Sequence, residues 1–81
     1  SGRSSDAFAG VLEKERLEIL RRAIEKLPPQ RRRCLVLWTY HDRTYQEIAT
    51  ALRLSLGTVK AHMAQAREQL ERLVDEVRNE T

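Results

Sequence analysis

Residues 56–70 hold the side chains whose types and spacing point most clearly to a chemistry, which is hydrogen bonding to nucleic acid. On an α-helix, with about 100° between successive residues, the apolar positions define one face and Ala61 lies at the centre of the opposite face. Gln65 on that opposite face can pair with adenine through both groups of its amide, and small alanine side chains can touch thymine methyl groups. We therefore expect the following residues to read bases in the major groove: Lys60, Ala61, Ala64 and Gln65.

A second set of residues suits the phosphate backbone, which positions a protein on DNA without specifying a sequence. The backbone N–H groups near Gly57 and Thr58 open a helix, and such groups bind phosphate. Arg67 lies nearer to the apolar face, so a salt bridge to Glu47 or Asp42 competes with a phosphate contact. The expected backbone contacts are Arg43, Thr44, Tyr45, Gly57, Thr58, His62 and Arg67.

Catalytic and metal chemistry find little support in the sequence. His41 and His62 fall on different predicted elements, and Cys34 is the only cysteine. The sequence has no Gly-rich phosphate loop and no nucleophile elbow, and one Cys with two His gives no metal-ligand spacing. We expect a protein that is not an enzyme and needs no cofactor or metal.

The DNA-facing residues must be positioned by two helices and a tight turn within residues 44–67. Thr44 and Glu47 form a capping box, in which each side chain satisfies a backbone donor at the start of a helix. Arg53 falls in the turn, where glycine usually supplies the left-handed conformation, and there it would cost about 1 kcal/mol. Ser55 is a good N-cap for the last helix. This arrangement is a helix-turn-helix, which presents its second helix to the major groove.

Two further helices precede this unit. The first runs from about residue 7 to 27, with an apolar stripe made of Phe8, Leu12, Leu17, Ile19, Leu20, Ala23, Ile24 and Leu27. Pro28 ends it, and Pro29 suits the first turn of the next helix, which we expect to reach about Tyr40. The buried side of that second helix is expected to comprise Cys34, Leu35, Leu37 and Trp38, with three outward arginines at 31–33.

The last helix carries an unbroken three-four alternation of apolar residues. Its members are Leu56, Val59, Met63, Ala66, Leu70, Leu73 and Val77. We expect the first part to pack inside the helix-turn-helix, together with Ile48, Ala49 and Leu52, and the second part to dock on the first helix. A coiled-coil dimer through residues 70–77 is the alternative, because the seam is heptad-like but short.

The bulk composition predicts one all-α domain of four helices. With 81 residues, 41% hydrophobic and 33% charged, the chain suits a single small globular domain rather than a disordered tail. No apolar run approaches the roughly 20 residues of a membrane span, and the polar N-terminus is no signal peptide. We expect residues 1–6 to be a flexible tail or cloning remnant and residues 7–81 to be the domain. A lone cysteine suits the cytoplasm, where we expect the protein to work.

Positive charge gathers on the suspected helix-turn-helix and on the segment before it. Residues 28–67 carry seven basic and two acidic side chains, whereas residues 68–81 carry two basic and five acidic ones. Counterion release makes such a basic patch favourable for a polyanion. On charge alone, a solvated arginine-rich face would look the same.

The combined motifs resemble region 4 of bacterial sigma-70-type sigma factors, and most closely the extracytoplasmic-function group. The resemblance rests on the runs 27–33, 34–37, 44–49 and 57–60 and on Ala66-Arg67, all in one register. It implies recognition of the upstream (−35) element of double-stranded promoter DNA, contact with the β-subunit flap of RNA polymerase, and masking by an anti-sigma factor. It also implies that Thr58, Lys60, Ala61, Ala64 and Gln65 face DNA, with Tyr45 and Arg67 near the backbone.

The sequence departs from the sigma pattern at a few positions. His62 and Gln65 stand where such helices often carry arginine, Arg43 replaces a usually apolar residue, and Arg53 replaces the turn glycine. Region 2, which binds the polymerase core, is absent, so we expect a fragment of a multidomain protein.

Two other readings stay open at this stage. The output domain of LuxR-type response regulators is also a four-helix unit with a similar run at 58–62, and it dimerises through its last helix. A protein-binding module built on a degenerate helix-turn-helix is the reading from another class. The Leu-Pro-Pro junction and the arginine-rich second helix favour the sigma resemblance.

Overall fold

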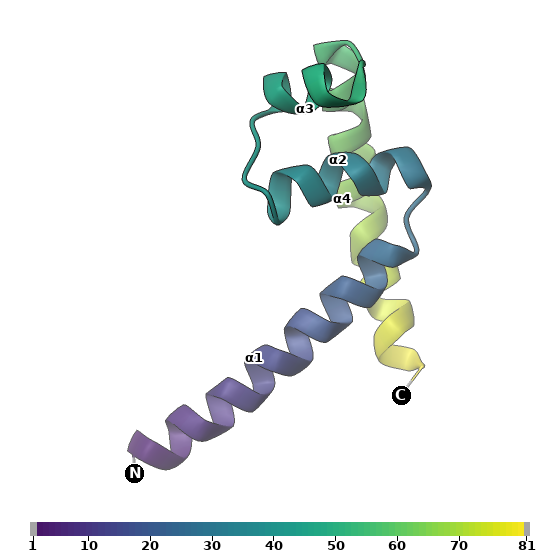
Figure 1. Cartoon of the computed structure of the whole chain (residues 1–81). Coiled ribbons are helices and arrows are strands. Elements are labelled where there is room, and N and C mark those ends of the chain that lie inside the picture. The colour runs from purple at the N-terminus through teal and green to yellow at the C-terminus, as the bar shows by residue number, and fades with distance from the viewer. Residues whose placement is uncertain (1, 81) are drawn as a thin grey trace.

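The chain folds into four helices packed around the last of them. The computed structural model describes the backbone of residues 2–80 and the side chains of residues 10–80. The helices are α1 (Gly2–Glu25), α2 (Pro29–Thr39), α3 (Tyr45–Leu52) and α4 (Leu56–Asn79). Figure 1 shows α2 crossing the middle of α4, with α3 beside the start of α4. The C-terminal part of α1 meets the C-terminal half of α4. The predicted all-α class and the order of the elements are confirmed.

Local sequence signals account for the starts of α2, α3 and α4. Pro28 is extended (φ −53°, ψ 146°), so α1 cannot continue, and Pro29 opens α2 where its missing N–H costs no hydrogen bond. Thr44 caps α3 through a complete capping box, and the Ser55 side chain caps α4. These three starts are those that the sequence predicted.

The turn between α3 and α4 uses a left-handed arginine. Arg53 has φ 57° and ψ 45°, and its N–H donates to the Thr50 carbonyl. The Leu54 N–H donates to the Ala49 carbonyl at 2.9 Å, which completes the pattern of a Schellman motif. The conformation usually given to glycine is therefore held by a side-chain-bearing residue, as the sequence indicated.

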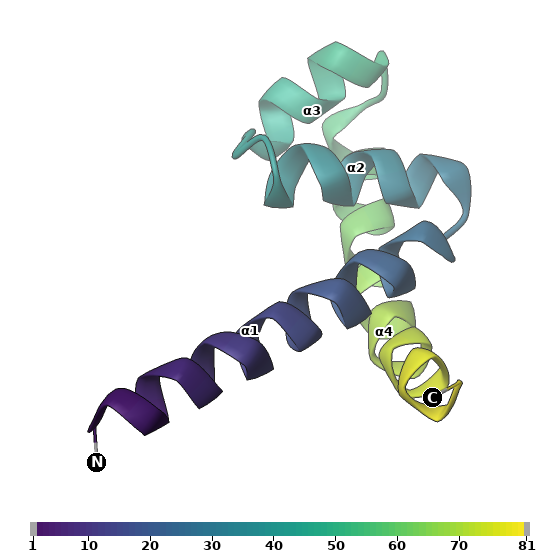
Figure 2. The ribbon, with the colours of Figure 1, turned by 60° about the horizontal axis from the view of Figure 1, so that its bottom comes forward.

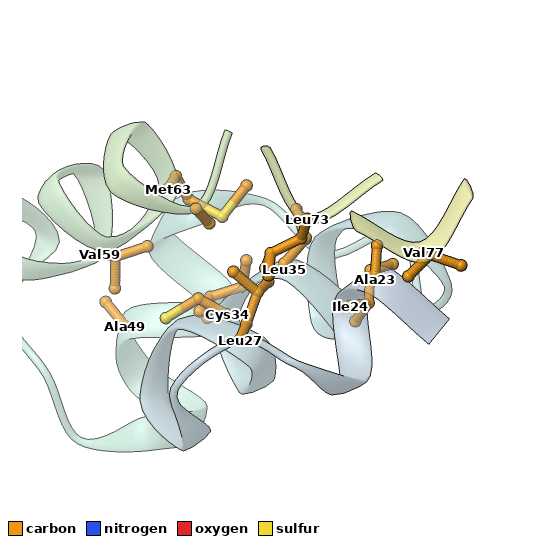
Figure 3. Close-up of a cluster of buried hydrophobic side chains, with 12 residues drawn as sticks. Ala23, Ile24, Leu27, Cys34, Leu35, Ala49, Val59, Met63, Leu73 and Val77 are labelled. Atoms are coloured by element: carbon orange, nitrogen blue, oxygen red, sulfur yellow. The ribbon is translucent and has the colours of Figure 1, made fainter. Parts of the chain in front are cut away.

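The core is a single apolar cluster to which all four helices contribute. It contains Ala23, Ile24, Leu27, Cys34, Leu35, Ile48, Ala49, Val59, Met63, Ala66, Leu73 and Val77. No polar or charged side chain among residues 10–80 is fully buried. Figure 3 shows Ala23, Ile24 and Val77 close together at one end of the cluster and Ala49 and Val59 at the other. The core therefore fixes the helix-turn-helix relative to α1 and α2.

The N-terminal half of α1 projects away from this core, as both ribbon views show (Figures 1 and 2). Leu17 is 54% exposed and Leu12 is also exposed, so the outer part of the predicted apolar stripe does not pack into the core. Helical spacing identified the correct face of α1, but α1 diverges from α4 beyond their contact, so α4 does not cover its outer turns (Figures 1 and 2). Phe8 lies outside the described side chains.

The start of α1 also differs from the sequence prediction. The helix begins at Gly2, ahead of the predicted start at about residue 7, and so includes residues 2–6 of the predicted flexible tail. Flexibility of that tail stays a prediction.

Two more apolar residues lie at the surface against expectation. Trp38 is 42% exposed and Leu56 is 37% exposed, although both were predicted to be buried. Trp38 follows fully buried Cys34 by one turn, but it lies at the end of α2, beyond the cover of the core. Leu56 is the first residue of α4, before the helix enters the core.

The second half of the α4 seam is occupied within the chain itself. Leu73 and Val77 are buried in the same cluster as Ala23 and Ile24 of α1. Docking of α4 on α1 is thus confirmed, and the face that a coiled-coil dimer would need is largely covered. Leu70 is only partly buried.

Two salt bridges, here called the clamp at Glu80, join the C-terminal ends of α1 and α4. Glu80, just after α4, accepts from Lys26 Nζ at 2.7 Å and forms a second salt bridge with Arg22. The hydrogen bond from Lys26, more than the nearby positive charges, holds the pKa of the Glu80 carboxyl below its usual range.

Candidate nucleic-acid interface

The outer face of α4 is the surface on which the predicted base-reading residues gather. Lys60, Ala61, Ala64 and Gln65 are all exposed, while Val59, Met63 and Ala66 on the opposite face are buried. The helical geometry derived from the sequence therefore gives the correct inward and outward sides. The alanines leave a shallow, low-relief surface beside one amide and one ammonium group.

The first turn of α4 offers fewer free backbone donors than the sequence suggested. The Thr58 N–H already donates to Ser55 Oγ at 3.1 Å, and the Thr58 hydroxyl hydrogen-bonds the same oxygen at 2.8 Å. Packing does not require glycine at the neighbouring position, because a Cβ on Gly57 would meet only Ser55 Oγ at 4.0 Å. The open donors for an anion are thus the N–H groups of Leu56 and Gly57, and Thr58 is committed to the cap.

Thr44 is also committed to a cap, at the start of α3. Its Oγ1 accepts from the Glu47 N–H at 3.1 Å, and its own N–H donates to Glu47 Oε1 at 2.9 Å. The backbone hydrogen bond from Thr44 is the main cause that lowers the pKa of the Glu47 carboxyl. Only the Thr44 hydroxyl proton is left to donate to a ligand, while exposed Arg43 beside it is a long cationic side chain.

Arg67 is held by uncharged groups on two other helices. Its Nη2 donates to the Tyr45 hydroxyl at 2.8 Å, and its guanidinium carbon lies 5.4 Å from the centroid of the Trp38 ring. The salt bridge to Glu47 or Asp42 that the sequence allowed does not form among the described residues. The structure therefore brings together Tyr45 and Arg67, two of the predicted backbone contacts.

Trp38 belongs to this group, and sequence reasoning missed it. The contact joins residues 29 positions apart on helices whose crossing cannot be read from periodicity. The spacing from Cys34 pointed to the core instead. The only available signal was the presence of an arginine and an exposed aromatic side chain on neighbouring helices, a pair of residue types that can form a cation–π contact.

His62 sits on the other edge of α4, away from Lys60 and Arg67. Its side chain is half-buried, and its Nδ1 is buried with no hydrogen-bond partner in the described part of the chain. Only the rest of the ring can face a ligand. His62 is therefore less accessible than Lys60 or Gln65, which are exposed.

The described residues contain no cluster of three or more His, Cys, Asp or Glu arranged to hold a metal ion. Over the same residues, no helix combines the length and apolarity of a membrane span.

Comparison with known families assigns this helix-turn-helix to a class. Residues 17–70 match the family model described as sigma-70, region 4. The chain belongs to the sigma-70 region 4 family. The match includes α2, α3, the turn and the first part of α4. The resemblance to sigma region 4 drawn from the sequence is therefore confirmed, in preference to the LuxR-type alternative.

A relative of this sigma region 4 domain is similar over much of the same span. The domain is 37% identical over 51 residues to the ECF RNA polymerase sigma factor SigE of Mycolicibacterium smegmatis. The aligned part is 63% of the domain but only 20% of that protein. The aligned residues thus span about a fifth of the length of this relative.

Proposed function

We propose that this sigma region 4 domain binds the upstream (−35) promoter element as part of a sigma factor, with α4 in the major groove. The observation that carries the proposal is the exposed face of α4, where Ala61, Ala64 and Gln65 lie opposite the buried Val59 and Met63. A helix with a low-relief outer face can enter a major groove, and a helix-turn-helix holds it there. As a DNA-binding part of the transcription apparatus, the domain would act in the cytoplasm and is not an enzyme.

In this proposal Gln65 reads a base and Lys60 contributes mainly charge. Gln65→Ala should cost about 1–3 kcal/mol on the preferred sequence and little on others. Lys60→Ala should weaken binding to all sequences alike and reduce the dependence of log affinity on log salt by about 1. Lys14→Ala on α1 is the matched control, because it removes the same charge far from the proposed interface.

Fluorescence anisotropy with promoter-like duplexes at two salt concentrations tests this function. Salt-sensitive binding, with sequence preference lost in Gln65→Ala, is the expected result. Failure to bind any duplex at low salt would contradict the function, and equal losses on every sequence for Gln65→Ala would remove Gln65 as a base reader.

We also propose that the shallow groove between α2 and α3 receives the β-subunit flap of RNA polymerase. The groove has an apolar floor and a basic rim, lined by Arg32, Arg33, Val36, Leu37, His41 and Leu52. It leaves the face of α4 free, so polymerase and DNA could be held together. An anti-sigma factor covering this groove would block the first of these contacts.

Charge reversal on the rim tests the polymerase contact. Arg33 is exposed and bonded only to nearby Gln30 among the described residues, so Arg33→Glu should leave the fold intact. We expect it to weaken binding of an isolated flap domain, measured by titration, while Arg16→Glu on α1 does not. Equal flap affinity in both variants would move the contact elsewhere.

A further inference from the structure

Trp38 occupies an unusual place for the only tryptophan of the chain. It is 42% exposed near the end of α2. Its ring nevertheless makes a contact within the chain, because the guanidinium carbon of Arg67 lies 5.4 Å from the ring centroid. A cation over an aromatic face at this distance is attracted by the electron density of the ring. The same guanidinium donates to the Tyr45 hydroxyl at 2.8 Å. Arg67 therefore joins α4 to both α2 and α3.

Both partners of Arg67 are neutral, and this leaves its charge available. None of the salt bridges in the described part of the chain involves Arg67; they use Arg21, Arg22 and Lys26. A guanidinium carries five N–H donors in a planar fork, and the hydrogen bond to Tyr45 uses one of them. The remaining donors and the full positive charge can still meet an anion.

The position of Arg67 on α4 indicates which anion that is. Lys60, Ala64 and Arg67 follow one another at four- and three-residue spacing, so they share one edge of the helix. Tyr45, which holds Arg67, opens the first helix of the helix-turn-helix. An anion at this edge would lie beside a DNA strand whose bases face Ala64 and Gln65.

We propose that Trp38 is a positioning residue for DNA binding: its ring, with the Tyr45 hydroxyl, holds the Arg67 guanidinium ready for a backbone phosphate. This inference rests on the proposed DNA-binding function and adds a residue of α2 that does not itself reach the groove. Arginine loses rotamer freedom when it is fixed by a ligand, so an arginine already fixed by the protein binds a phosphate more tightly.

A double-mutant cycle on promoter-like duplex tests the role of Trp38. Trp38→Leu keeps an apolar side chain but removes the aromatic face, and we expect it to weaken binding about two- to fivefold, the range of an exposed cation–π contact. Trp38→Phe keeps a ring and should lose less. Arg67→Ala should weaken binding and lower the salt slope by about 1. In the Arg67→Ala background, Trp38→Leu should have no further effect.

The cycle separates positioning from a structural role. If Trp38→Leu weakens binding by the same factor with and without Arg67, or does not weaken it at all, the inference is overturned while the DNA-binding function stands. If the wild-type chain fails to bind duplex even at low salt, the proposed function fails and this inference falls with it. Should Trp38→Leu not fold, Trp38→Phe serves in the same cycle, and additive losses there count equally against the proposal.

Discussion

The Leu54 N–H donates to the Ala49 carbonyl at 2.9 Å, and this hydrogen bond closes the end of α3 around Arg53. The closure requires the left-handed backbone of Arg53 (φ 57°, ψ 45°), which a residue with a Cβ adopts at a cost. The turn sets the angle at which α4 leaves α3. The strained residue, Arg53, therefore lies in the turn that joins the two helices of the helix-turn-helix.

Replacing Arg53 by glycine should stabilise the domain. Glycine adopts this conformation without the steric cost, although it also gains freedom in the unfolded chain, so we expect a net gain of up to about 1 kcal/mol in the free energy of unfolding. Chemical denaturation measures the change. Arg53→Ala is the control, since it removes the same charged side chain but keeps the Cβ; equal stability of the two variants would contradict strain at this position.

The capping box predicts a pH dependence that a conservative change abolishes. The pKa of the Glu47 carboxyl is lowered in the folded chain, chiefly by the hydrogen bond from the Thr44 N–H. Its ionised form therefore stabilises the fold above the pKa that glutamate has in the unfolded chain, and this contribution is lost as pH falls through the lowered folded pKa. Glu47→Gln keeps an acceptor oxygen but cannot ionise.

We expect wild type to be more stable than Glu47→Gln at neutral pH and the difference to vanish in acid, as measured by denaturation at a series of pH values. Thr44→Ala should cost about 1 kcal/mol at neutral pH, because it removes the side-chain cap itself. A constant difference between wild type and Glu47→Gln across the series would mean that the carboxylate charge does not contribute.

The parts of the site that the sequence predicted are those encoded by neighbouring residues. Pro28 and Pro29 separate α1 from α2, Thr44 and Glu47 start α3, and Ser55 starts α4. In each case the partners lie within four positions of each other, so no knowledge of the tertiary arrangement is needed. The inward and outward faces of α4 follow in the same way from its periodicity.

The incorrect burial predictions concern residues that lie beyond the region where one helix covers another. Leu17 and Trp38 have core spacing, yet both are exposed because α4 does not extend over the outer turns of α1 and the core does not reach the end of α2. The contact of Arg67 with Trp38 likewise depends on how α2 crosses α4. Periodicity gives the direction of a side chain but not the extent of its neighbour.

The clamp at Glu80 should stabilise the packing of α4 on α1. Lys26 and Arg22 both pair with its carboxylate, and the hydrogen bond from Lys26 lowers the pKa of Glu80. Glu80→Gln should lower the thermal midpoint at neutral pH and low salt, and the loss should shrink at high salt because exposed charges are screened. The effect should disappear in acid as Glu80 protonates.

The control for the clamp is Glu71→Gln, which removes an equal charge from the exposed surface of α4. Calorimetric scans of both variants at low and high salt provide the comparison. Matching shifts in the two variants would show that the change reflects net charge rather than the contacts of Glu80 with α1.

Gly57 offers a test in which stability and DNA affinity should change in opposite directions. A Cβ at this position meets only Ser55 Oγ at 4.0 Å, so the fold leaves room for alanine. Alanine is favoured over glycine in a helix by up to about 1 kcal/mol, and less near a helix end, so Gly57→Ala should be neutral or stabilising. If a phosphate approaches the first turn of α4, the added methyl group should nevertheless weaken DNA binding.

Gly10→Ala supplies the matched control, because a Cβ at Gly10 meets nothing within 4 Å and the residue lies on the projecting part of α1. We expect a similar gain in stability with unchanged affinity for promoter-like duplex, measured by denaturation and anisotropy on the same samples. Unchanged affinity in Gly57→Ala would place the phosphate away from the start of α4. A loss confined to Gly57→Ala would mean that glycine there serves DNA binding rather than folding, since the fold itself accepts the larger residue.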